Sequence, residues 1–221
     1  MRTFFRDNGL SLVVLTIFLV CLVGQALTGW HVYNEEQTSH GEPTESLTGY
    51  LGTGHFAEAV FENWESEFLQ MGAYVILTVF LFQRGSAESK DPDKENPSDE
   101  DPREHRDDED APGPVRRGGL ALKLYEHSLS LAFLALFLAS FVGHAWGGAA
   151  EYSDEQAQHG EPPVSAWEFV RTSRFWFESL QNWQSEFLAV GAIVILSIWL
   201  RERGSPESKP VARPHRSTGE E

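Results

Sequence analysis

Long apolar segments alternate with polar ones along the chain, and the apolar segments predict four membrane-spanning helices. Segments 10–30 and 129–148 are apolar apart from small or weakly polar residues. About 20 apolar residues in a helix cross the ~30 Å hydrocarbon core of a bilayer. Two further apolar segments, at about 66–83 and 185–201, follow amphipathic stretches with the period of a helix. We therefore expect each of these spans to continue a helix that begins outside the membrane.

The whole pattern occurs twice, at a constant offset of 119 residues. Segments 33–43 and 152–162 agree at seven of eleven positions, and 63–90 agrees with 182–209 at 18 of 28. Such a repeat sets the unit of structure. The sequence therefore predicts four parts: a two-span repeat at 1–85, a linker at 86–118, a second two-span repeat at 119–204 and a tail at 205–221. The expected fold is an all-α integral membrane protein made of two parallel-repeat helical hairpins.

The first apolar segment has an alternative interpretation as a secretory signal peptide. Arg2 and Arg6 precede it, and Gly24-Gln25-Ala26 resembles a cleavage site. The same pattern recurs at 129–148, where no signal peptidase step is expected. The repeat therefore favours a membrane span.

The distribution of basic residues predicts the orientation. Fifteen Lys and Arg residues lie before the first span, in the linker and its edges, or in the tail, whereas only Arg171 and Arg174 lie in the two opposite loops. Cytoplasmic segments of membrane proteins carry the excess of Lys and Arg. We expect a multi-pass protein of the cell membrane with both termini in the cytoplasm.

Segment 86–118 differs in composition from the rest of the chain. It holds twelve acidic residues and five prolines, and Val115 is its only aliphatic side chain larger than alanine. Such a segment cannot bury enough apolar surface to fold, so we predict a disordered acidic linker. A solvated spacer is the simplest role, and an acidic interaction segment is the alternative.

The overall composition excludes some functions. A net charge of −16 argues against a nucleic-acid partner, which would require a basic face. Cys21 is the only cysteine, so no disulfide forms within one chain. The motifs of soluble nucleotide-binding and hydrolytic enzymes are absent. We expect no cofactor and no enzymatic activity.

The first candidate site is a doubled turn. His40-Gly41-Glu42 returns as His159-Gly160-Glu161, and the spans share one orientation, so His40, Glu42, His159 and Glu161 lie at equal depth. Two imidazoles and two carboxylates suit zinc or a similar divalent ion if the two turns converge. The alternative is that each histidine forms a hydrogen bond within its own tight turn.

The second candidate site lies where the amphipathic helices enter the apolar segments. Its doubled polar residues are Asn63, Glu67, Asn182 and Glu186, within Asn-Trp-x-Ser-Glu-Phe-Leu. Ionisable residues at membrane depth are costly and often functional. The alternative, which we favour, is that each glutamate lies at the headgroup level and fixes the depth of its helix.

Deeper in the apolar segments there is little chemistry. His144 is the only acid or base there, which argues against a pump or a voltage-gated channel. Small residues let helix backbones approach closely. We therefore expect close helix contacts at Gly24, at Gly143 and Gly147, and at the equivalent positions Gly72 and Gly191.

The chain resembles a family of small bacterial membrane proteins of unknown function. The resemblance rests on the opening segment 4–12, on Gly29-Trp30 with Tyr33-Asn34-Glu35, on His40-Gly41-Glu42, and on the segment 64–70. The second copy departs from the opening motif and has Ala149 in place of Trp30. The resemblance implies a bacterial cytoplasmic membrane and brings no catalytic residue.

We interpret the chain as a non-enzymatic membrane protein whose doubled outer motif forms a packing or binding surface. Two alternatives stay open: a small transporter or channel, and an outer-face divalent-metal site with metal-dependent activity. The expected partners are the lipid bilayer and either another membrane protein or further copies of the chain.

Overall fold

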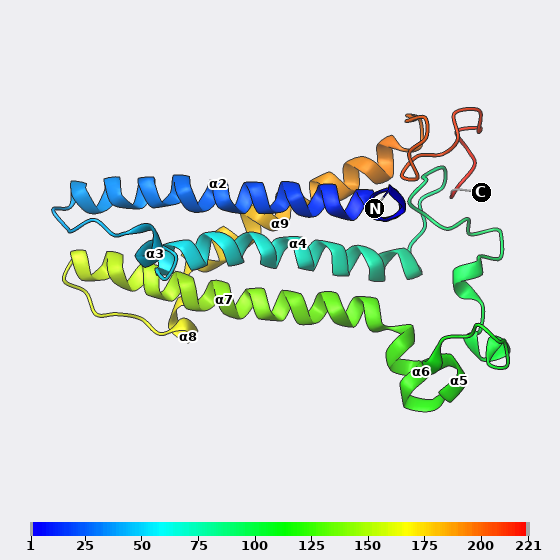
Figure 1. Ribbon diagram of the computed structural model, residues 1–221, viewed down its shortest axis with the longest axis horizontal. Helices are drawn as coiled ribbons and strands as arrows, with labels where there is room; N and C mark the ends of the chain where they lie inside the picture. Colours follow the sequence, from blue (N-terminus) through cyan, green and yellow to red (C-terminus); the bar gives the residue numbers. More distant parts are fainter. Residues whose placement is uncertain (1, 220–221) are drawn as a thin grey trace. The chain divides into compact units, whose positions relative to one another are not determined.

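The computed structural model describes residues 2–219, and every regular element in that range is a helix (Figure 1). The four long helices are α2 (Gly9–Ser39), α4 (Gly54–Phe80), α7 (Ser128–Gln158) and α9 (Ser173–Leu196). The short ones are α1 (Arg2–Asp7), α3 (Leu47–Tyr50), α5 (Gly113–Arg117), α6 (Gly119–Glu126) and α8 (Ala166–Phe169), with 3-10 helices η1 (Pro97–Asp99) and η2 (Pro102–His105). The expectation of an all-helical chain is confirmed for the described residues.

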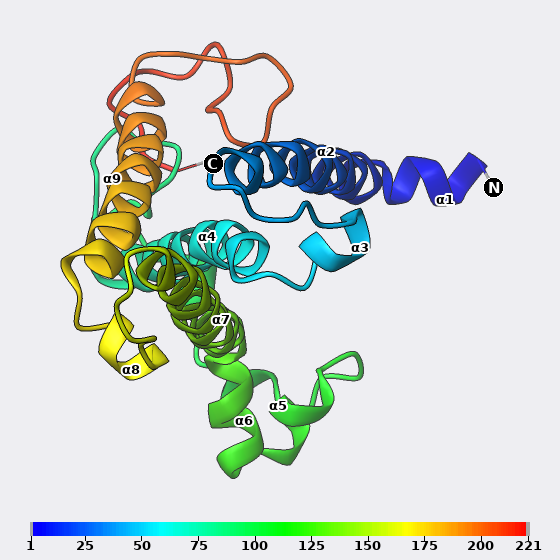
Figure 2. The ribbon, with the colours of Figure 1, turned by 90° about the vertical axis from the view of Figure 1, so that its left-hand side faces the viewer.

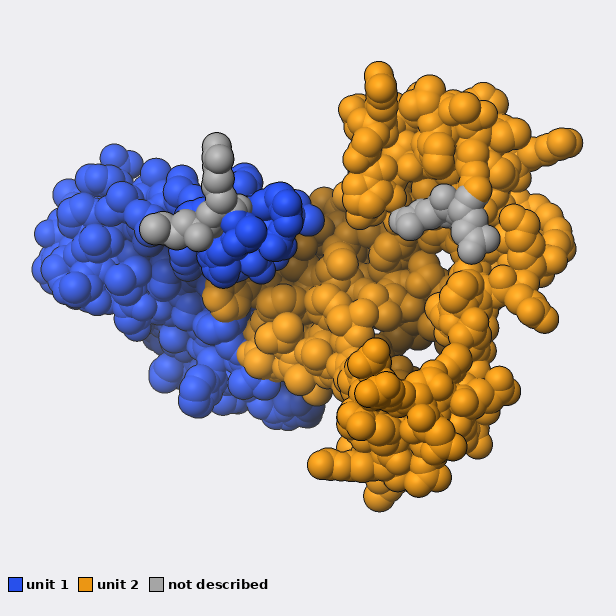
Figure 3. Space-filling model, turned by 45° about the vertical axis from the view of Figure 1, so that its right-hand side comes forward, with its two compact units in different colours: residues 1–61, 142–175 blue, residues 62–141, 176–221 orange. Residues whose placement is uncertain are grey.

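The chain divides into two compact units, which Figure 3 colours separately. Unit 1 comprises residues 1–61 and 142–175, and unit 2 comprises 62–141 and 176–221. Each unit therefore takes residues from both copies of the repeat. The division falls inside α4, α7 and α9 and not at the linker, and the predicted domain boundaries stay a prediction.

The helices expose many of their large apolar side chains. No residue of α2 is buried, and large side chains such as Leu10, Ile17 and Val20 are exposed. Across the described residues, ten apolar side chains are buried against thirteen polar or charged ones. Two helices, α2 and α7, are long and apolar enough to cross a membrane.

The other two predicted spans end earlier than expected. The sequence predicted spans to residues 83 and 201, whereas α4 ends at Phe80 and α9 at Leu196. The guanidinium of Arg201 explains the second end, because it donates to the carbonyls of Ser197 and Ile198 at 2.9 and 3.3 Å. Terminal carbonyls that lack helical partners are commonly satisfied by a basic side chain in this way. Two described helices, not four, therefore meet the length and composition of a span.

The close helix contacts expected at glycines are partly found. A Cβ atom built on Gly143 would lie 2.5 Å from the Phe61 ring, and one on Gly72 would lie 3.1 Å from Phe133. These two predictions are confirmed. Nothing lies within 4 Å of such an atom on Gly24 or Gly191, so the expectation is wrong at those two positions.

The acidic linker contains short elements in unit 2. It holds η1, η2 and α5, and α5 packs against α6 (Figure 2). A small buried cluster there consists of Ala111, Val115 and Leu122. Val115, the one large aliphatic side chain of the linker, is therefore buried. The ion pairs Arg84–Asp93 and Lys90–Asp99 are exposed on at least one side and contribute little. The prediction of disorder stays a prediction.

Candidate functional site

The doubled His-Gly-Glu motif ends helices α2 and α7. Gly41 and Gly160 have φ values of 78° and 76°, which only glycine adopts readily. The amides of Glu42 and Glu161 each donate to a carbonyl five residues earlier, at 2.9 Å in both copies. This is the Schellman arrangement of a helix C-terminus. The motif therefore forms the C-terminal cap of each helix, with the same geometry in both copies.

Both motif histidines contact their own helix. His40 Nδ1 lies 3.0 Å from the carbonyl oxygen of Glu36, and His159 Nδ1 lies 2.9 Å from that of Glu155. Both imidazoles, like Glu42 and Glu161, are exposed. This geometry matches the turn interpretation of the motif. The metal interpretation stays a prediction, and no described cluster of three ligating side chains includes either histidine.

The segment after each turn folds back through a short helix. Ser46 accepts a hydrogen bond from the Gly49 amide at the start of α3, and Ser165 forms a capping box with Glu168 at the start of α8. Each short helix then buries one aromatic side chain, Tyr50 or Phe169.

These two aromatic rings pack against glycines that occupy equivalent positions in the two copies. Tyr50 fills the space beside Gly29, and Phe169 fills the space beside Gly148, so any Cβ atom on either glycine would overlap the ring. Figure 1 shows α3 beside α2. The glycines therefore hold the two loops of unit 1 against their own helices.

A basic side chain follows each buried ring at an equivalent position. In the first copy His55 Nδ1 lies 3.1 Å from the Tyr50 hydroxyl, and its ring lies 5.5 Å from Tyr33. In the second copy Arg174 lies over the Tyr152 ring at 5.6 Å and pairs with Glu155. Burial lowers the pKa of His55, and the carboxylates of Glu36 and Glu155 oppose this shift.

In unit 1 the first turns of α4 approach α7 closely. A Cβ atom on Gly147 would lie 2.5 Å from the Glu58 amide nitrogen, and one on Gly54 would lie 2.5 Å from the Glu151 amide nitrogen. Only glycine allows backbones to approach this closely. The approach brings polar side chains of both helices into a tightly packed region.

Glu58, His144 and Glu151 form the group that we call the inner cluster. Glu58 is 7% exposed and His144 is fully buried, and a carboxylate oxygen of Glu58 lies within 4.8 Å of a ring nitrogen of His144. The His144 ring stacks on Phe175 at 4.5 Å. Buried ionisable groups are costly to charge unless they are paired or bind an ion.

Glu151, the third member of the inner cluster, lies on α7 seven residues after His144, and this spacing places both residues on one face of the helix. Glu58 packs against Gly148, which lies between them. Glu151 is 8% exposed, and one of its carboxylate oxygens has no hydrogen-bond partner in the described part of the chain. It lies beyond the apolar segment 129–148. Burial, with the nearby carboxylates Glu155, Asp154 and Glu36, raises the pKa of Glu151 to about 7, and Arg174 opposes this only partly.

The sequence matches one protein family along nearly its whole length. A family model described as a domain of unknown function (DUF6766) matches residues 1–220. The chain belongs to this family. No curated protein and no solved structure matches it. The resemblance to an uncharacterised family, inferred from the motifs, is thereby confirmed.

The second motif of this family member lies in unit 2. Ser66 donates to the carbonyl of Asn63, and Ser185 to that of Asn182, each at 2.8 Å. The side chain of Glu67 is exposed and that of Glu186 is partly exposed. Gln70 donates to the Glu186 carbonyl at 3.3 Å and so joins α4 to α9 within unit 2. These local contacts fit the role of fixing helices, and the functional role stays a prediction.

The repeat draws attention to doubled polar residues, and no member of the inner cluster is doubled. Each of its members occupies a position at which the two copies differ: Glu58 is equivalent to Phe177, His144 to Gln25, and Glu151 to Val32. The available signal was an ionisable side chain in one copy at a position that is not ionisable in the other. A side chain that is ionisable in only one copy is not required by the helix packing that the two copies share.

Proposed function

We propose that the protein is a multi-pass membrane protein with four spans, and that the inner cluster of unit 1, at the outer membrane face, binds a small cation. The exposed apolar surface of α2 and α7 supports the membrane location, because α2 buries no side chain and α7 buries few, and such helices need an apolar surrounding. The hydroxyls of Thr16 and Thr28 bond within α2, to the carbonyls of Leu12 and Gly24 at 2.7 and 2.8 Å.

Helices α4 and α9 serve in this proposal as shorter spans. The apolar helical part of α4, from Phe68 to Phe80, is about 20 Å long at 1.5 Å per residue. Spans shorter than the bilayer are accommodated by local thinning and by flanking side chains that extend to the interface. The Lys and Arg excess places both termini and the linker in the cytoplasm, and unit 1 loops outside.

The topology has a direct test. Reporter fusions after Gly49 and after Val164 are expected to give extracytoplasmic signals, and fusions at Ser98 and at the C-terminus cytoplasmic ones. A cytoplasmic signal at either loop contradicts the four-span proposal.

The unpartnered carboxylate oxygen of Glu151 is the observation that carries the binding proposal. The inner cluster and its neighbour Glu155 contribute three carboxylates, whereas Arg174 is the permanent cation beside them: it pairs with Glu155 and lies 3.9 Å from Glu58. A group with more carboxylates than cations is stabilised when it takes up a positive ion. No large space is needed for a single ion.

The donor set indicates the class of ion. One imidazole nitrogen and carboxylate oxygens suit divalent metals such as zinc and manganese. The probe is each metal alone: the purified protein is stripped with a chelator, dialysed against zinc, manganese or calcium, and its bound metal is measured. We expect one ion per chain for at least one divalent metal. Absence of bound metal with all three ions contradicts the proposal.

Transport is a second candidate, favoured by the position of these ionisable groups at the ends of apolar helices. Metal uptake into sealed proteoliposomes, compared with protein-free vesicles, separates transport from binding alone.

A further inference from the structure

Two loops in unit 2 have the same sequence motif, Arg-Gly-Ser-x-Glu-Ser-Lys. The first exit loop is 83–90 and follows α4, and the second exit loop is 202–209 and follows α9. Gly85 and Gly204 occupy equivalent positions and have φ values of 85° and 89°. The two loops therefore turn in the same way.

The hydrogen bonds inside the two loops also match. In the first, the Gln83 amide donates to Ser89 Oγ at 2.9 Å, and the Glu88 amide to Ser86 Oγ at 3.1 Å. The equivalent bonds of the second loop, from Glu202 to Ser208 and from Glu207 to Ser205, measure 2.9 and 3.2 Å. In each loop the second serine also donates to the carbonyl of the following lysine. The two loops are therefore the same structure.

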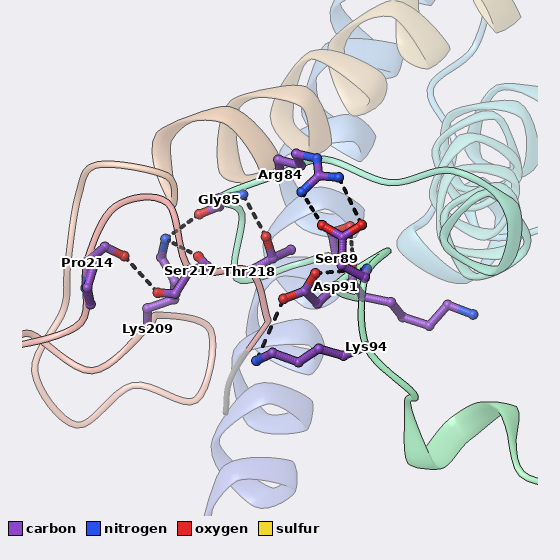
Figure 4. A network of polar contacts seen from close by, with 11 residues as sticks. Arg84, Gly85, Ser89, Asp91, Lys94, Lys209, Pro214, Ser217 and Thr218 are labelled. Atoms are coloured by element: carbon purple, nitrogen blue, oxygen red, sulfur yellow. Dashed lines mark hydrogen bonds and ion pairs between the residues drawn. The ribbon is translucent and has the colours of Figure 1, made fainter.

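The first exit loop holds the C-terminal segment 209–219 of its own chain (Figure 4). The Thr218 hydroxyl accepts from the Gly85 amide at 2.9 Å, and the Gly219 amide donates to the Ser86 carbonyl at 2.9 Å. The fully buried ammonium of Lys209 donates to the Gly85 carbonyl. Backbone groups of the loop are thus satisfied by the tail.

The segment wraps around this lysine. Lys209 also donates to the carbonyls of His215 and Ser217 at 2.9 and 2.8 Å, so one ammonium orders both the tail and the loop that receives it. A Cβ atom on Gly85 would lie 2.8 Å from the His215 carbonyl oxygen. The first exit loop is therefore covered at Gly85, Ser86 and Ala87, which are buried.

The second exit loop is open at the equivalent groups. Among residues 2–219, no side chain or backbone group bonds to the Gly204 amide, the Gly204 carbonyl or the Ser205 carbonyl. A Cβ atom on Gly204 would meet nothing within 4 Å. The loop borders a hollow of about 790 Å³ lined by residues 202–206 and 208–212. The same backbone surface is thus covered in one copy and open in the other.

We propose that the second exit loop is a docking site for the C-terminal segment 209–219 of a second copy of this chain. This segment already docks on the first exit loop, which has the same structure. The groups that bind that loop are the ammonium of Lys209 and a Thr-Gly pair nine residues later. The occupant comes from another copy because Lys209 is itself the last residue of the second exit loop. The docking segment leaves the first exit loop of its own chain, and the contact joins unlike surfaces of the two copies, so copies add head to tail.

Cross-linking between two differently labelled chains tests this docking. The background variant Cys21→Ser removes the only cysteine. One protein carries Arg203→Cys beside the second loop and the other carries Ser217→Cys in the tail; the full chains are mixed and treated with a short bis-maleimide. We expect 203–217 links to exceed 203–203 and 217–217 links at least tenfold.

Two variants distinguish cross-links due to docking from cross-links due to random collision. Lys209→Ala in the Ser217→Cys chain removes the docking ammonium and is expected to reduce the 203–217 links about tenfold. Arg84→Cys with Ser217→Cys in one chain is the positive control and should give a link within the chain. If that control links while 203–217 links stay at the level of the like pairs, or if Lys209→Ala leaves them unchanged, the proposal is wrong.

Discussion

A carboxylate oxygen of Glu58 lies within 4.8 Å of a ring nitrogen of His144, although 86 positions separate the two residues in the chain. Gly147 makes this approach possible, since its missing side chain leaves space for the backbone of α4. Neither Glu58 nor His144 has an equivalent of the same type in the other copy. The repeated sequence thus builds a scaffold, and the unrepeated residues supply its ionisable groups.

Substitution of the contact glycine should destabilise unit 1. We expect Gly147→Ala to lower the free energy of unfolding by about 1–3 kcal/mol, because the new methyl group would lie 2.5 Å from a backbone nitrogen of α4. The matched control is Gly191→Ala, which places the same group on α9 with nothing within 4 Å. Thermal unfolding in detergent measures both. Equal midpoints for the two variants would contradict the close contact.

The two helix stops should depend on their glycines. Gly41→Ala and Gly160→Ala force alanine into a left-handed conformation, at a cost of about 1–2 kcal/mol each. Denaturation midpoints should fall in both variants by similar amounts, since the two turns share the same hydrogen bonds. Gly24→Ala, within a regular helix, should have no such cost. A neutral Gly41→Ala would show that the helix does not end there.

Glu151 should make stability depend on pH. Its pKa is raised to about 7 in the folded chain, above the value near 4.3 of the free carboxyl. The folded state therefore binds more protons between these values, and its stability falls as pH rises through about 7. The loss amounts to about 4 kcal/mol at most. Unfolding midpoints between pH 5 and 8, measured with a chelator present, should fall in the wild type.

Glu151→Gln is the matched variant for this pH dependence, because it keeps the shape and removes the titration. Its midpoint should vary much less between pH 6 and 8. His55 acts in the opposite direction at lower pH, since its lowered pKa makes the folded chain lose stability as pH falls below about 6.5. The same slope in Glu151→Gln and wild type would assign the effect to another group.

Periodicity and repetition predicted much of the fold. The apolar segments and the helical stripe that continues into α4 depend on local sequence, which predicts them. Helices α2 and α7 continue beyond the expected spans 10–30 and 129–148, to Ser39 and Gln158. The early ends of α4 and α9 were not predictable, because they depend on contacts with distant residues. Ser197, for example, lies 3.0 Å from the Ser86 hydroxyl, 111 residues away.

The inner cluster needed the three-dimensional arrangement. The sequence marked His144 as the one basic group within an apolar segment, but it gave no reason to pair it with Glu58. That pairing follows from which face of α4 meets α7, which the glycines at 54 and 147 decide. The candidate residues chosen from the repeat, His40 and His159, have their ring nitrogens against their own helix carbonyls.

Cation-dependent stabilisation tests the central claim most directly. Zinc, added to chelator-stripped protein at pH 7.5, should raise the thermal midpoint, because an ion that binds only the folded chain stabilises it by about 2.7 kcal/mol at 100 times its dissociation constant. His144→Gln, which introduces the residue of the first copy, should abolish the rise, as should Glu58→Gln. The double variant His40→Ala with His159→Ala should keep it. A rise that survives His144→Gln, or that disappears in the double variant, would contradict the account.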